Sequence, residues 1–93
     1  MPLDFKDETW TRGTHICFRN LGKMNASRVT NVYDVLSLDN VLLGTIRWYG
    51  AWRKYCFYPE AETLYEETCL SEVAEFIKTE TLKHRAKAKA ARA

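Results

Sequence analysis

Residues 29 to 59 constrain the fold most, because three β-prone segments there are separated by two turn signals. Those segments are Val29–Leu38, Val41–Tyr49 and Trp52–Tyr58. All three are rich in β-branched and aromatic residues. Asp39-Asn40 tolerates positive φ, and Gly50-Ala51 fits a two-residue turn with glycine first. Pro59 ends the third segment because it has no N–H to donate. The pattern predicts a three-stranded antiparallel meander.

Two-residue turns also predict a register, and the register sorts the side chains into two faces. It pairs Tyr33 and then Tyr55 with Ile46, and it places Gly44 opposite Phe57, where the missing Cβ leaves room for a ring. The predicted core face carries Tyr33, Val35, Leu42, Ile46, Tyr55 and Phe57. The opposite face carries Arg47, Tyr49, Trp52, Lys54 and Tyr58, beside Val32, Asp34, Leu36, Leu43 and Thr45.

The segment after the meander predicts one helix, capped by Thr68 and buried as far as Glu80. Its apolar stripe, at i, i+3, i+4 and i+7, is Leu70, Val73, Ala74 and Ile77. Thr14–Phe18 is a candidate fourth strand at the sheet edge. We therefore expect an α+β fold in which a three- to four-stranded antiparallel meander sheet packs one face on one C-terminal helix. Residues 1–82 form this single domain, and residues 83–93 form a basic tail, as a solvent-exposed or frayed helix.

Charge is distributed unevenly along the chain. The tail holds five cations and no acid, which leaves residues 1–82 with a net charge of −3 within an overall +2. A slightly acidic body differs from a uniformly basic nucleic-acid binder. No apolar run approaches the roughly 18 residues of a membrane span, so we expect no membrane association.

The block from Leu43 to Pro59 reads LGTIRWYGAWRKYCFYP. It resembles a motif in small proteins of unassigned function from tailed bacteriophages and prophages, and Thr63-Leu64-Tyr65, Cys69-Leu70 and Phe76-Ile77 match its continuation. The resemblance covers about residues 32 to 77, and it departs at Ala51, where phage members often have proline. It implies a phage origin and action in the cytoplasm of an infected bacterial host. It supplies no catalytic residues.

Cations and rings alternate on the second predicted face at Arg47, Tyr49, Trp52, Lys54 and Tyr58. Such a face grips single-stranded nucleic acid in some proteins, because bases stack on rings while cations follow phosphates. The same residues also fit a protein-binding surface, or simple packing with the charged heads in water. Arg53 is expected on the helix side, either snorkelling into water or paired with Glu72 or Glu75, or alternatively held for an anionic ligand.

Residues that carry chemistry are sparse. The histidines are His15 and His84, and the odd set of cysteines, Cys17, Cys56 and Cys69, is typical of reduced thiols. No metal-ligand spacing, phosphate-binding glycine loop or nucleophile motif occurs. Glu60, Glu62, Glu66 and Glu67 fit a solvated acidic loop. We expect no enzyme activity, no cofactor and no metal.

The leading hypothesis is a small phage-type accessory protein that binds a host or antiviral-defence protein, in the manner of an inhibitor, through the aromatic and basic sheet face. The alternative is a nucleic-acid binder that uses the same face plus Lys83, Arg85, Lys87 and Lys89 of the tail. A third possibility is a homo-oligomer formed through an exposed sheet edge.

Overall fold

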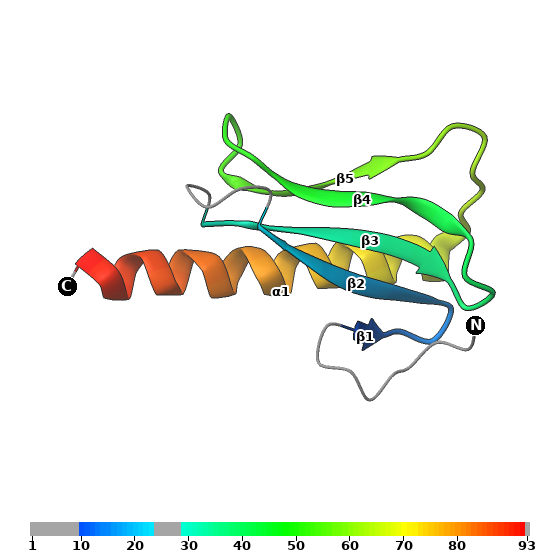
Figure 1. Ribbon diagram of the computed structural model, residues 1–93, viewed down its shortest axis with the longest axis horizontal. Helices are drawn as coiled ribbons and strands as arrows, with labels where there is room; N and C mark the ends of the chain where they lie inside the picture. The colour runs from blue at the N-terminus through cyan, green and yellow to red at the C-terminus, as the bar shows by residue number, and fades with distance from the viewer. Residues whose placement is uncertain (1–9, 24–28, 93) are drawn as a thin grey trace.

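The computed structural model describes residues 10–23 and 29–92, which form an antiparallel sheet and one long C-terminal helix (Figure 1). The strands are β1 (Trp10–Arg12), β2 (Ile16–Lys23), β3 (Asn31–Ser37), β4 (Leu42–Tyr49) and β5 (Lys54–Pro59), and the helix is α1 (Glu67–Arg92). The five strands are neighbours in chain order, so the sheet is an open meander. The predicted fold class is thus confirmed, with five strands in place of three or four.

The N-terminal part of the sheet differs from the sequence prediction. Of the candidate edge strand at 14–18, residues 16–18 begin β2, which lies inside the sheet between β1 and β3. β1 is the edge strand on this side of the sheet, and its three residues are too few to be recognised from a periodic pattern. The expected order of the central strands is otherwise retained.

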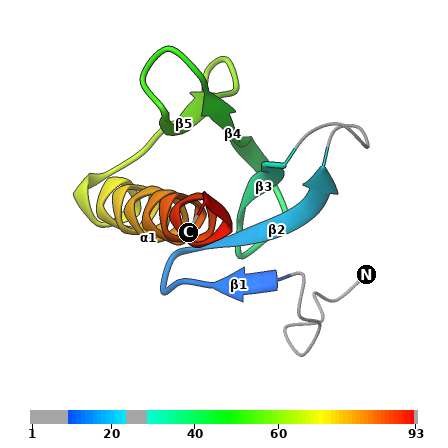
Figure 2. The ribbon, with the colours of Figure 1, turned by 90° about the vertical axis from the view of Figure 1, so that its left-hand side faces the viewer.

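One face of the sheet curves around α1, as the view along the helix shows (Figure 2). Burial alternates along β3 and β4, as expected when only one face is covered. The core consists of Ile16, Phe18, Tyr33, Val35, Ile46, Tyr55, Val73 and Phe76. Phe76 of the helix stacks on Phe18 at a centroid distance of 4.1 Å, and its edge meets Tyr33. Aromatic packing therefore joins the helix to the middle of the sheet.

The β3–β4 hairpin keeps most of the predicted register. Tyr33 pairs with Ile46 and Val35 pairs with Gly44, and Asn40 at the turn has φ 69°. A bulge after Val35 then pairs Leu36 with Leu42 and not with Leu43. Because of this irregularity Leu42, predicted in the core, is exposed, and Leu43 packs against the core instead.

The β4–β5 hairpin has a longer loop than predicted. Tyr49 pairs with Lys54, so residues 50–53 form the loop, which is closed by Trp52 and Arg53 N–H groups that donate to the Tyr49 carbonyl. Positive φ occurs at Arg53 (54°), at the end of the loop, where the two-residue turn would have used Gly50. The pairing shifts by two residues, which places Phe57 opposite Ile46. Because a shift of two residues preserves the alternation of side chains, the residues of β5 still lie on their predicted faces.

The buried stripe of α1 differs from the prediction at two of its four sites. Val73 and Ile77 face the sheet as expected, but Leu70 and Ala74 are exposed. Cys69 and Phe76 take their places beside the core. The stripe also continues past Glu80, because Thr81 is buried and its Oγ1 accepts the Tyr55 N–H at 3.1 Å. The helix therefore packs along more of its length than the apolar residues indicate.

The helix starts one residue before the predicted cap. Glu66 and not Thr68 caps α1, since its carboxylate accepts the Cys69 N–H at 2.7 Å. Backbone N–H donation from Cys69 and Thr68 holds the pKa of Glu66 at about 2. At the other end the tail is helical to Arg92 in unbroken continuation of the packed part. Whether residue 83 marks a domain limit stays a prediction.

Candidate functional site

The predicted cation and ring face lies on the side of the sheet away from α1. Across β4 and β5, Thr45 pairs with Tyr58 and Arg47 pairs with Cys56, so these side chains share one face. The Arg47 guanidinium carbon is 3.9 Å from the centre of the Tyr58 ring. Both side chains are half-buried. Arg47 and Tyr58 therefore engage each other, and neither is a freely exposed contact residue.

The exposed part of this face is at the end of the β4–β5 hairpin. We call Tyr49, Trp52 and Lys54 the hairpin tip. The Trp52 ring meets the Tyr49 ring edge-on at 5.0 Å, while 65% of Trp52 remains exposed. Of the five predicted binding residues, the structure thus brings three together as an accessible cluster.

A second cation and ring pair lies on the open face of the other strands, and the sequence reasoning did not find it. Arg19 of β2 lies over the Trp10 ring at 5.5 Å, and Arg19 is the cross-strand neighbour of Asp34. Desolvation raises the pKa of the Asp34 carboxyl, while the Arg19 charge partly opposes that rise. The only signal in the sequence was the alternation within β2. The partner strand on its N-terminal side, β1, is too short to be predicted from such a pattern.

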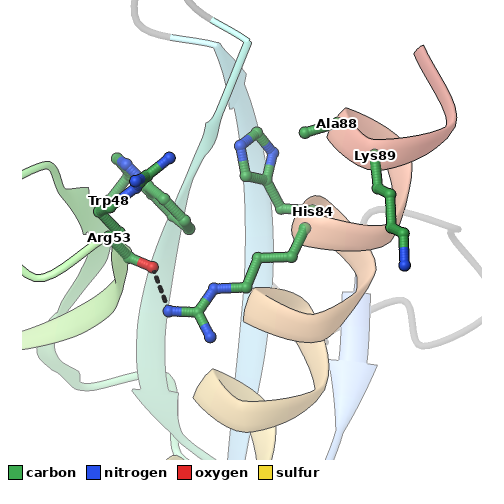
Figure 3. A pocket seen from close by; sticks show the side chains of 6 residues that line it. Trp48, Arg53, His84, Ala88 and Lys89 are labelled. Atoms are coloured by element: carbon green, nitrogen blue, oxygen red, sulfur yellow. Dashed lines mark hydrogen bonds between the residues drawn. The ribbon is translucent and has the colours of Figure 1, made fainter. Parts of the chain in front are cut away.

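On the helix side, a groove separates the β4–β5 loop from the C-terminal turns of α1 (Figure 3). It has a volume of about 600 Å³. Its lining, which we call the basic groove, is Trp48, Arg53, His84, Arg85, Ala88 and Lys89. The Trp48 and His84 rings are 4.6 Å apart, and Arg85 Nη2 donates to the Arg53 carbonyl at 2.7 Å, marked by the dashed line in Figure 3. These contacts dock the tail helix against the hairpin loop.

The predicted ion pairs of Arg53 do not form among the described residues. Glu72 instead accepts the backbone N–H groups of Thr14 and His15, and its carboxylate lies 3.9 Å from His15 Nδ1. The helix glutamates lie earlier along α1, whereas Arg53 lies beside Arg85, about three turns further on. The second sequence interpretation, an arginine held for an anion, remains a proposal.

The four tail cations do not form one surface. Arg85 and Lys89 line the basic groove. Lys83 and Lys87 line a different groove of about 510 Å³ on the other flank of α1, together with Tyr33 and Tyr55 of the sheet. Lys83 also pairs with Glu80 at 3.6 Å. In an α-helix, side chains two residues apart point about 200° away from each other. Successive cations of the tail therefore lie on opposite flanks of α1.

His84 and Trp48 were not predicted as neighbours. The signal for them is the spacing Ile77, Thr81, His84 and Ala88, which continues the buried stripe at intervals of four, three and four residues. Polar residues occupy two of these positions, so a search for apolar residues ends the stripe too early. The basic groove is a consequence of that hidden continuation.

The thiols and acids show no assembled chemical centre in the described residues. Burial raises the pKa of the Cys17 thiol, which disfavours the nucleophilic thiolate. Within residues 10–23 and 29–92, no three His, Cys, Asp or Glu side chains are grouped so as to hold a metal ion. Over the same residues, α1 offers no stretch that is long and apolar enough to cross a bilayer.

Comparisons with protein-family models, with curated proteins and with solved structures find no match to this chain.

Proposed function

We propose that the protein is a small phage-type accessory protein that works by binding and not by catalysis, and that it contacts a host or antiviral-defence protein through the hairpin tip. The observation that carries this proposal is the exposure of the Trp52 ring at the end of a hairpin whose base is buried. Tryptophan and tyrosine dominate the binding energy of protein interfaces, where partner groups exclude water from them.

The hairpin tip is suited to such a contact because it is held in shape. The Tyr49 ring supports Trp52 from one side. The loop is closed by backbone hydrogen bonds, and the Arg85 side chain fastens it to α1. A contact surface that is ordered before binding loses less conformational entropy on association. Lys54 adds a charge at the rim of the cluster.

The test is affinity capture from infected bacterial lysate, using the wild-type chain, the Tyr49→Ala/Trp52→Ala double variant and Leu64→Ala as a matched control. Leu64 is 92% exposed and lies in the β5–α1 connection at the far end of the molecule from the tip (Figure 1). We expect the same nuclease-resistant protein to be retained by wild type and Leu64→Ala and to be lost with the double variant. Retention by the double variant would contradict the proposal.

A second candidate function is nucleic-acid binding through the same face and the tail. One observation favours it: the hydrogen bond from Arg85 to Arg53 places part of the basic helix beside the hairpin tip. A strand that stacks a base on Trp52 would then have cations near its phosphates. The division of the tail cations between two flanks of α1 counts against a long, continuous track.

Fluorescence anisotropy with a labelled single-stranded oligonucleotide tests this second candidate. Binding should weaken with salt, with a log–log slope of about −0.7 for each phosphate contact. Trp52→Ala combined with Lys54→Ala should remove most of the affinity, whereas Leu64→Ala should not. Absence of binding at low salt would leave the protein-contact proposal as the better one.

A further inference from the structure

We propose that the basic groove binds a nucleoside phosphate, with the base against Trp48 and the phosphates against Arg53 and Arg85. This site is separate from the protein contact proposed above, because neither Tyr49 nor Trp52 lines the groove. A volume of about 600 Å³ is within the range of about 300–1,000 Å³ of small-molecule sites.

The charge of the groove is the first argument. Arg53, Arg85 and Lys89 carry positive charge, and none of the six lining residues is acidic. Among the residues that the structure describes, no carboxylate pairs with Arg53, Arg85 or Lys89. Three unpaired cations around one hollow concentrate positive potential there, which attracts an anion.

The two arginines favour an oxyanion that can accept paired hydrogen bonds. Arg85 uses one N–H to bond the Arg53 carbonyl, and that bond fixes its guanidinium next to the loop. The rest of its planar set of five donors is left for a ligand. Guanidinium groups bind phosphate oxygens in pairs of parallel hydrogen bonds, which lysine does not do.

An aromatic ring beside the cations extends the site from phosphate to nucleotide. The Trp48 ring packs nearly perpendicular to the Tyr55 ring at 5.3 Å and lies 4.6 Å from the His84 ring, so its position is fixed. Any of the nucleobases can stack on such a ring. Ring and guanidinium groups are therefore found at one groove, as a nucleoside phosphate requires.

Helix stability does not account for the two arginines of the groove. Positive residues near a helix C-terminus offset the macrodipole, but the effect is confined to about the last turn. Arg85 lies about two turns before the end of α1 at Arg92. Arg53 is not on the helix at all, and it occupies a left-handed backbone conformation with φ 54°. The macrodipole accounts for Lys89, which lies in the last turn of α1, whereas Arg53 and Arg85 are better explained by an anionic ligand.

Isothermal titration calorimetry of the full chain tests the proposal with ADP, adenosine and pyrophosphate at low salt. We expect ADP to bind more tightly than either fragment. Arg53→Ala should raise the dissociation constant for ADP by about tenfold or more, since a charge-assisted hydrogen bond is lost. Lys78→Ala is the matched control, because Lys78 is an exposed cation on the same helix outside the groove.

A pentadeoxyadenylate titration shows whether the phosphate comes from a free nucleotide or from a strand. If the oligonucleotide competes with ADP for the wild-type protein and this competition is lost in Arg53→Ala, the groove is assigned to a nucleic-acid strand. If ADP binds and the oligonucleotide does not, the groove is assigned to the free nucleotide. Trp52→Ala should leave ADP binding unchanged, which separates this site from the proposed protein contact. No ADP binding, equal loss in Lys78→Ala, or equally tight binding of pyrophosphate or hexaglutamate would each overturn the proposal.

Discussion

Arg53 has the costliest backbone conformation of the hairpin. It closes the four-residue loop with φ 54°, where an L-residue loses roughly 1–2 kcal/mol relative to glycine. Its carbonyl is also the acceptor for Arg85. Glycine would satisfy the same loop and the same hydrogen bond without the steric cost. The side chain is therefore retained at the expense of stability.

Arg53→Gly should raise the free energy of unfolding by up to about 1 kcal/mol, because the strain is relieved while glycine adds some freedom to the unfolded chain. Urea denaturation followed by circular dichroism measures this. Arg53→Ala, which removes the same charge but keeps Cβ, should give no such gain. A gain of equal size in Arg53→Ala would show that charge repulsion, and not backbone strain, destabilises the loop.

Gly44 is required by a close approach that the sequence partly indicates. A Cβ at this position would lie 2.5 Å from the Tyr58 carbonyl oxygen and 2.7 Å from the Phe57 ring. Gly44→Ala should therefore cost about 1–3 kcal/mol of stability, as overpacked sites do. Gly50→Ala is the control, with no heavy atom within 4 Å of its added Cβ. Equal unfolding midpoints for the two variants would refute the close packing.

At the scale of elements, one hydrogen bond joins the helix to the sheet edge. Thr81 accepts the N–H of Tyr55, which points outward from β5, the last strand of the open sheet. An unsatisfied edge N–H invites pairing with another chain. The helix thus covers part of this edge, and self-association through β5 loses one of its donors. This contact concerns β5 alone and not β1, the other edge of the sheet, so the homo-oligomer stays a proposal.

Thr81→Val should destabilise the fold by about 1–3 kcal/mol, because the methyl group keeps the volume but leaves the Tyr55 N–H without its acceptor. Thr79→Val, at an exposed position on the same helix, is the matched control for changed helix propensity. Chemical denaturation of both variants gives the comparison. A difference below about 0.5 kcal/mol would mean that water replaces the threonine oxygen.

The elements show which parts of the fold were predictable from the sequence. Turn residues and β-prone segments predicted the meander, and alternation predicted its two faces. Loop length was not predictable, since Arg53 is a residue that rarely takes positive φ. The sequence placed the buried stripe of α1 at Leu70, because leucine is more apolar than cysteine. In the structure the position of each residue relative to the sheet decides its burial, and Cys69 lies at the core. The basic groove depends on the loop and on the polar continuation of the stripe at Thr81 and His84, so sequence reasoning missed it.

For the whole molecule, the core is organised around buried tyrosines. Tyr33 meets the edges of Tyr55 and Phe76, and it is 5% exposed. Desolvation raises the pKa of Tyr33 to about 12 and raises that of Tyr55 as well. A hydroxyl whose pKa is higher in the folded than in the unfolded state stabilises the fold while it stays protonated.

Stability should therefore be unaffected by these tyrosines below about pH 10, the unfolded pKa, and should fall as pH rises from there to about 12. Urea midpoints across this range give the measurement, with tyrosinate absorbance as a second readout. Tyr33→Phe should flatten the decline, whereas Tyr49→Phe at the exposed tip should not. A flat profile for wild type would contradict the desolvated core.

The sequence of charges along α1 has one further consequence. As far as Glu80 the helix carries Glu67, Glu72, Glu75 and Glu80, and beyond that point it carries Lys83, Arg85, Lys87 and Lys89. These groups are spread over a rod of about 39 Å, so they give the molecule a permanent electric moment. The electric field of a large, negatively charged partner therefore turns the molecule before collision. The C-terminal end of α1 and the neighbouring β4–β5 hairpin then face that partner. This orientation would increase the fraction of encounters that lead to binding. Added salt would lower the association rate constant without altering the contacts made in the complex.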